Sequence, residues 1–121
     1  MVILPTSIRW ADAHLESVRL DYDHLVIAIS DDAGSHRSIR ASGYIGFTYT
    51  GVWDETIIRQ GVLVEGHEHA AESWVQIEGR HHGLIPSSGS QARNHRRWKT
   101  LVLTFSDDSE LKCSAAEFVE E

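Results

Sequence analysis

The sequence has little of three things that define whole classes of protein: cysteine, proline and long apolar runs. Among 121 residues there are two prolines and a single cysteine, Cys113. One cysteine cannot form an intrachain disulfide, so we expect a small buried side chain here and a reducing, cytoplasmic compartment. No apolar run approaches the roughly 18 residues of a membrane-spanning helix, and the apolar start before Pro5 is too short for a signal peptide. The length suits one domain with its own core.

Catalytic signatures are also absent. The sequence contains no glycine-rich phosphate loop and no Gly-x-Ser-x-Gly elbow, and the lone cysteine lacks the local pattern of a nucleophile. Two pairs of carboxylates occur, at 31–32 and 107–108, but each lies at the end of an apolar run. Aspartates are common there because they form turns. The sequence therefore favours a protein that acts by binding rather than by catalysis.

Acidic residues are missing from one long segment, although the net charge is −7. Between residues 79 and 106 there is no Asp or Glu, and the stretch 93–99 (RNHRRWK) concentrates the positive charge. Arginine beside an aromatic ring can contact a phosphate backbone and stack on a base. The acidic remainder would oppose the approach of a polyanion, and the interpretation we favour is that these residues pair with that acidic part or solvate the entry to the strand at 98–105. If they bind a partner, Arg93, Arg96 and Arg97 suit a protein, with nucleic-acid binding as a third possibility.

The dominant hydrophobic period is two residues, which predicts β-strands. We expect six to eight strands in a single antiparallel β-sandwich or strongly curved sheet spanning 1–121, with at most one or two short helices. In the strand at 42–52, Gly43 and Gly46 allow a bulge or a close backbone neighbour. The other expected strands form the pairs 17–22 with 25–29, 61–65 with 73–78, and 98–105 with 111–119. Short helical turns are expected at 54–60 and 10–15, and a mobile loop at 79–97.

The stretch GHEHAAE, residues 66–72, offers a metal site. On a strand, His67 and His69 would point to one face and could share an ion. With Gly61 before it and Gly79 after it, the stretch resembles the first cupin motif. That resemblance implies a divalent transition metal held by His67, His69 and Glu72 in a small β-barrel. The interpretation we favour is the solvated end of a hairpin, without a cofactor.

The first half of the chain carries a second resemblance. The run WADAHL leads into SVRL, a short turn and LVIAI, and FTYTGV follows at 47–52. This order resembles small bacterial β-rich proteins that include immunity proteins of polymorphic toxin systems. The resemblance implies a protein that binds a toxin and blocks it without chemistry, and an acidic surface would suit a basic nuclease. Independently of it, a half-exposed indole at Trp53, beside Asp54 and Glu55, could anchor a partner.

Overall fold

A computed structural model describes residues 2–51, 55–80 and 98–121, and in this part of the chain seven strands form one antiparallel sheet. The order across the sheet is β1-β5-β6-β7-β4-β3-β2. One helix, α1 (Glu68–Arg80), lies between β5 and β6 in the sequence. The strands are β1 (Val2–Leu4), β2 (His14–Leu20), β3 (His24–Ser30), β4 (His36–Thr50), β5 (Ile58–Glu65), β6 (Lys99–Phe105) and β7 (Glu110–Glu120).

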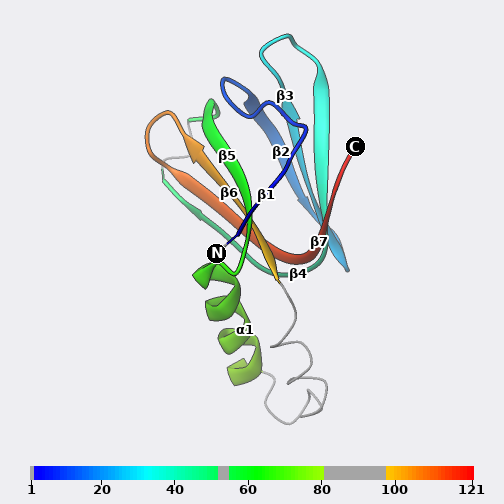
Figure 1. Ribbon diagram of the computed structural model, residues 1–121, viewed down its shortest axis with the longest axis vertical. Helices are drawn as coiled ribbons and strands as arrows, with labels where there is room; N and C mark the ends of the chain where they lie inside the picture. Colours follow the sequence, from blue (N-terminus) through cyan, green and yellow to red (C-terminus); the bar gives the residue numbers. More distant parts are fainter. Residues whose placement is uncertain (1, 52–54, 81–97) are drawn as a thin grey trace.

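The sheet bends sharply where β4 and β7, its two longest strands, cross from one half to the other (Figure 1). On β4, Gly43 has a φ of 63°, and the pairing with β7 shifts by one residue between Tyr44 and Gly46. An extra residue of this kind bends a strand and increases its twist. The result is two arms, one built around β2 and β3 and the other around β5 and β6. The fold class expected from the sequence, a strongly curved antiparallel sheet, is confirmed.

The arms are joined at one corner by main-chain hydrogen bonds. The Asp12 N–H donates to the Ile58 carbonyl at 2.8 Å, and the Ile58 N–H donates to the Ala13 carbonyl at 2.7 Å. The Leu15 N–H donates to the Thr56 carbonyl at 2.9 Å. These bonds hold the start of β2 against the start of β5 without closing the sheet into a barrel.

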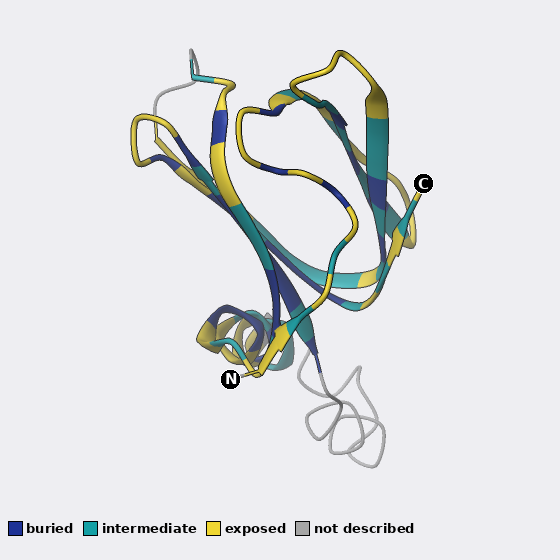
Figure 2. Cartoon of the chain, turned by 45° about the horizontal axis from the view of Figure 1, so that its top comes forward, coloured by how far each residue is buried: buried dark blue, intermediate teal, exposed yellow. Residues whose placement is uncertain are grey.

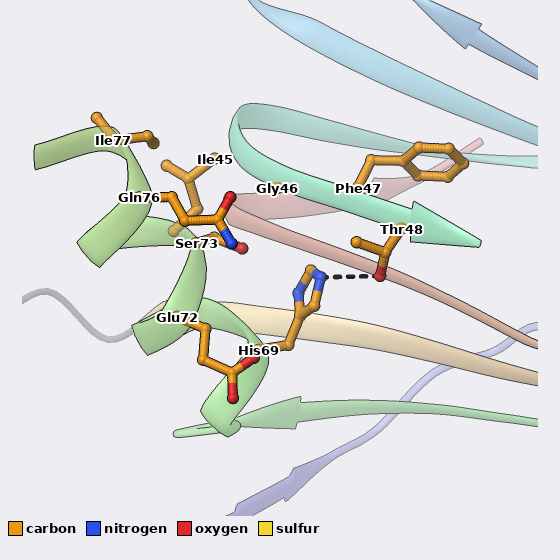
Figure 3. A pocket seen from close by; sticks show the side chains of 9 residues that line it. All are labelled: Ile45, Gly46, Phe47, Thr48, His69, Glu72, Ser73, Gln76 and Ile77. Atoms are coloured by element: carbon orange, nitrogen blue, oxygen red, sulfur yellow. Dashed lines mark hydrogen bonds between the residues drawn. The ribbon is translucent and has the colours of Figure 1, made fainter. Parts of the chain in front are cut away.

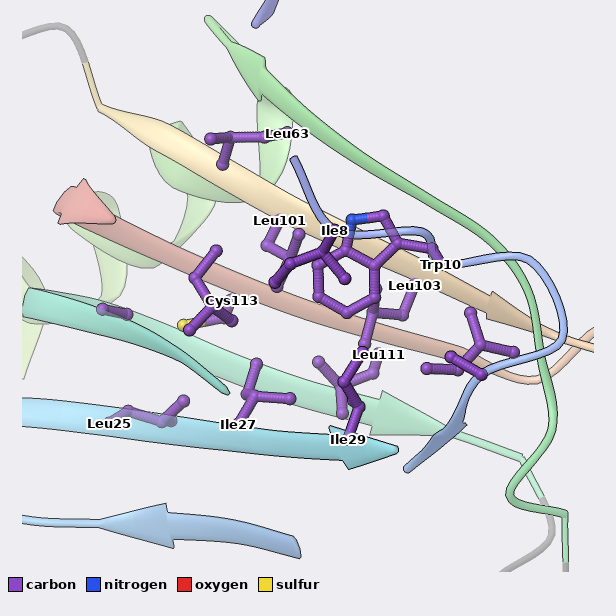
Figure 4. Close-up of a cluster of buried hydrophobic side chains, with 14 of the residues drawn as sticks. Ile8, Trp10, Leu25, Ile27, Ile29, Leu63, Leu101, Leu103, Leu111 and Cys113 are labelled. Carbon is purple, nitrogen blue, oxygen red and sulfur yellow. The ribbon is translucent and has the colours of Figure 1, made fainter. Parts of the chain in front are cut away.

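The main core fills the space between the arms, and alternating side chains of every long strand point into it (Figure 4). From β3 come Leu25, Ile27 and Ile29, each at most 1% exposed. The segment before β2 runs between the arms (Figure 2) and adds Ile8 and Trp10 to the core. Each buried aliphatic or aromatic side chain contributes about 1.5–3 kcal/mol, so this core dominates the stability of the fold.

On the opposite face of the sheet, α1 packs against β4, β7 and β6 at one end (Figure 1). Ala70 and Trp74 of the helix pack with Trp98, whose ring stacks on that of Trp74 at a centroid distance of 6.0 Å. Ile77 adds to the same cluster, so the buried positions follow the i, i+4, i+7 spacing of an amphipathic helix. The sheet therefore has apolar clusters on both faces, and β4 takes part in both.

Several expectations from the sequence are confirmed. The hairpin of β2 and β3 and the closing hairpin of β6 and β7 occur where the alternation placed them. The second hairpin turns at Asp107 and Asp108, and Asp108 has a positive φ of 71°. Gly43 and Gly46 border the expected bulge, and Cys113 is fully buried.

Four assignments need correction. The expected strand at 73–78 is part of α1, because the alanines and glutamate before it favour a helix and its apolar residues suit helical spacing. The expected helix at 54–60 is wrong throughout its described part: residues 55–57 are not helical, Ile57 forms a β-bridge with His14, and β5 begins at Ile58 in a β-branched run. At 10–15 there is only one turn, closed by the Ala13 N–H and the Trp10 carbonyl, before β2 starts at His14. The expected loop at 79–97 begins later, since Gly79 and Arg80 belong to α1, and 81–97 lies outside the described residues.

Candidate functional site

The stretch GHEHAAE is the start of helix α1 and not the end of a hairpin. His67 precedes the first helical residue, and its Nδ1 accepts a hydrogen bond from the His69 N–H at 2.9 Å. His67 is therefore the N-cap, and it satisfies one of the main-chain donors that every helix leaves open at its first turn. The placement of both histidines on one face of a strand, on which the metal prediction rested, is wrong.

His69 is buried at the junction of α1 with the sheet, with 7% of its surface exposed. Its Nε2 is 3.1 Å from Oγ1 of Thr48 on β4 (Figure 3). Its Nδ1 is 2.6 Å from Oγ of Ser114 on β7. Ser114 in turn lies 2.8 Å from Oγ1 of Thr100 on β6. A neutral imidazole has one donor and one acceptor, and hydroxyls can serve as either, so both ring nitrogens have partners. This network connects α1 to three strands.

The surroundings of His69 favour the neutral form of its ring. Burial lowers the pKa of His69 below its ordinary value of 6.5, and the charges of Lys112 and His67 lower it further, while Glu72 acts in the opposite direction. A metal ion would have to displace Thr48 or Ser114 from the ring. Within residues 2–51, 55–80 and 98–121, no group of three or more His, Cys, Asp or Glu side chains is placed to hold a metal ion. The structure thus gives His67 and His69 roles in capping and anchoring α1.

A pocket of about 190 Å³ lies beside this network, between α1 and β4 (Figure 3). We call it the helix pocket. Gly46 lines it, and the Gly46 backbone lies so close to the helix that an added Cβ would be 2.7 Å from the Ser73 Cβ. Its lining consists of 45–48 on β4 together with His69, Glu72, Ser73, Gln76 and Ile77 on α1.

A second pocket, of about 210 Å³, lies on the core side of the same part of β4. We call it the apolar pocket. Leu15 and Val18 of β2 form one wall, and Phe47 forms another. Its one carboxylate, Glu55, already accepts hydrogen bonds from the Ile57 N–H at 2.8 Å and the Ser106 hydroxyl at 2.6 Å. Tyr49, Thr56 and Leu111 complete the lining.

Between the two pockets runs a sheet edge. On the side of β4 that faces away from β7, pairing with β3 ends at Ser42, and no strand of the described chain pairs with 45–48 on that side. We call this side of residues 45–48 the open edge. Its sequence, IGFT, contains neither a charge nor a proline. Phe47 lines both the helix pocket and the apolar pocket, so one short segment of backbone separates them.

The main-chain direction of Phe47 follows from the neighbouring hairpin. The Phe105 N–H donates to the Ser109 carbonyl at 2.9 Å, so Ser109 faces β6. In antiparallel pairing, residues that face one neighbour recur at every second position, so Lys112 faces β4. Thr48 is opposite Lys112 and therefore faces β7. Phe47, one residue before, directs its N–H and C=O to the open edge.

The other residues predicted for partner contact are only partly placed. Glu55 is described, and hydrogen bonding from the Ser106 hydroxyl, followed by the Ile57 N–H, lowers the pKa of its carboxyl. Glu72, which the cupin resemblance implied as a metal ligand, lines the helix pocket. Trp53, Asp54, Arg93, Arg96 and Arg97 lie outside the described residues. Sequence reasoning missed Phe47, Thr48 and Ser114, and the signal for the first two was an uncharged, aromatic strand segment with two glycines.

Burial raises the pKa of the Cys113 thiol to about 12, which makes it inert, as expected of a small core side chain. No helix in the described part of the chain is long and apolar enough to cross a membrane.

In comparisons with known proteins, no family model, no curated protein and no solved structure matches this chain.

Proposed function

We propose that this protein binds an extended segment of a partner protein, which adds to the sheet as a strand along the open edge of β4. The observation that carries the proposal is the position of Phe47, whose main-chain N–H and C=O face outward between two pockets. Strand addition uses main-chain hydrogen bonds for affinity and pockets for alternate side chains for specificity. Main-chain groups that face outward and two pockets lie together at this edge.

The two outermost strands carry features that discourage pairing, whereas the open edge has neither charge nor proline and carries only the bulge between Tyr44 and Gly46 at its start. β1 has only three residues. β2 carries Glu16 and Arg19, and its pairing with β3 is irregular between Leu15 and Ser17. Short length, charges and bulges are the devices by which sheet proteins protect their edges. Because the open edge has no charge and no proline, we interpret it as an edge kept available for a partner.

The proposal covers the protein-binding function expected from the sequence, and an inhibitor of immunity type is its narrower form. In that form the partner would be a toxin or enzyme whose active surface is covered when its segment docks on β4. The net charge of −7 would speed association with a basic partner. A cytoplasmic setting suits the single buried cysteine.

The first test is amide hydrogen exchange measured residue by residue by NMR. In the free protein we expect the Phe47 amide to exchange about 100-fold faster than the Thr48 amide, because only the latter is bonded within the sheet. A nonapeptide selected from a random phage-displayed library on the whole protein should then slow exchange at Phe47. Equal protection of Phe47 and Thr48 in the free protein would contradict an open edge. Protection of Phe47 that grows with protein concentration would identify a second copy of the chain as the occupant instead.

A further inference from the structure

We infer that the segment bound at the open edge carries an apolar side chain opposite Phe47 and a lysine or arginine at an adjacent position, facing α1. This inference rests on the proposed function and specifies the chemistry of the partner. It follows from the different linings of the two pockets on either side of one strand.

The alternation of an added strand determines which pocket each side chain meets. Directly opposed residues on neighbouring strands have side chains on the same face, about 4.5–5.5 Å apart at Cβ. Phe47 packs against the main core, so the residue opposite it points into the apolar pocket. Thr48 bonds to His69 of the helix, so the residue opposite Thr48 points to the side of α1 and the helix pocket.

The apolar pocket suits an aliphatic or aromatic side chain. Leu15, Val18 and Leu111 provide apolar walls, and the carboxylate of Glu55 is already bonded to the Ile57 N–H and the Ser106 hydroxyl. A polar side chain entering here would lose water without gaining a partner. An apolar one would be buried favourably, which corresponds to a gain of about tenfold or more in affinity.

The helix pocket suits a cation. Glu72 contributes the one carboxylate of its lining and has no ion pair among the described residues, and Gln76 adds an amide. The opposing charge is Lys112, which lies on β7 next to Thr48 but does not line the pocket. His69 has both ring nitrogens bonded inside the protein. An entering side chain therefore meets a negative charge and hydrogen-bond acceptors, which complement lysine or arginine.

The experiment uses the selected nonapeptides, synthesised and titrated onto the whole protein. In the consensus peptide, replacing the apolar residue by serine should weaken binding about tenfold or more, and replacing the cation by glutamate about fivefold. Glu72→Gln should abolish most of the discrimination between the lysine and glutamate peptides.

Two tryptophan variants of α1 form a matched pair. Gln76→Trp fills the helix pocket and should weaken the consensus peptide at least tenfold. Val75, its neighbour, is 68% exposed and lines neither pocket, so Val75→Trp should bind as the wild type does. Thermal melting of both variants shows whether either change has damaged the fold, and Glu72→Gln provides the answer if Gln76→Trp does not fold.

The possible results separate the two proposals. Peptides that protect the Phe47 amide but show no alternation of apolar and basic residues, or prefer glutamate at the cation position, would overturn this inference and leave the proposed function standing. If no selected peptide protects Phe47, docking beside the helix is refuted and the proposed function fails with it. If Gln76→Trp and Val75→Trp bind the peptide equally well, docking beside the helix is refuted.

Discussion

Replacing Gly46 by alanine tests whether helix α1 rests directly on β4, which is the contact that forms the helix pocket. An alanine Cβ at this position would lie 2.7 Å from the Ser73 Cβ and 3.3 Å from Cε1 of His69, and still closer to the Ser73 hydroxyl. Overpacking of this kind typically costs 1–3 kcal/mol. Alanine offsets about 0.5–1 kcal/mol of this, because it loses less backbone entropy than glycine on folding. We expect a net loss of about 1–2 kcal/mol in the free energy of unfolding, measured by urea denaturation.

The second change in this test is Ser73→Gly, which removes the closest atoms. Glycine inside a helix costs about 1 kcal/mol by itself. With the clash relieved, the double variant should be about as stable as Ser73→Gly alone, so the two changes should be strongly non-additive. Gly79 is the matched control, because it lies on the same helix and, among the described residues beyond its own stretch of helix, no atom lies within 4 Å of its missing Cβ. Gly79→Ala should stabilise by about 0.5–1 kcal/mol. A neutral Gly46→Ala, or additive losses in the double variant, would refute the close contact.

Two further predictions concern the histidines. His67→Ala should lower the free energy of unfolding by about 1 kcal/mol, because the N-cap bond to the His69 N–H is lost. His67→Asn should keep most of the wild-type stability, because asparagine can also cap a helix, and urea titrations of the three proteins measure both effects. Equal losses in both variants would argue against a cap. His69, whose pKa is lowered by burial first and then by Lys112 and His67, binds fewer protons in the folded state than in the unfolded chain. The contribution of His69 to the free energy of unfolding is therefore fully present above pH 6.5, the ordinary pKa of histidine. It is lost as the pH falls from there toward the lowered pKa of the folded state. Unfolding free energies measured from pH 8 to pH 5 should decline less for His69→Gln than for the wild type, and parallel curves would show that His69 is not the group responsible.

Much of the sheet could be predicted from local pattern. In β3, Leu25, Ile27 and Ile29 alternate with residues that are less buried, and β6 repeats the pattern with Leu101, Leu103 and Phe105. A period of two suits a strand with one face in a core, and the nearby turn residues determine where each hairpin reverses. These signals are short-range, so the two hairpins were placed correctly without knowledge of the rest of the fold.

The helix was missed because its own pattern is ambiguous over a short window. In SWVQIE, Val75 and Ile77 alternate as in a strand, yet Val75 is exposed and the buried residues are Ala70 and Trp74, with Ile77 partly buried. Only a window reaching back to His67 includes the cap, the alanines and the i, i+4, i+7 spacing together. The same error put His67 and His69 on a strand and suggested a shared metal ion.

The sequence by itself determined the elements whose cause is local: the alternating strands, the turns between them, the glycines that permit the bend in β4, and a lone cysteine suited to the core. Only the tertiary structure decided which groups from distant positions meet. His69, Thr48 and Ser114 are joined because α1 crosses the outer face of β4 and β7. Phe47 faces an open edge because the sheet bends away from β3 after Ser42. The uncharged, aromatic strand segment around Phe47 is visible in the sequence, but neither relation is, since both depend on sheet order and on the bend, which arise from the packing of two arms around one core.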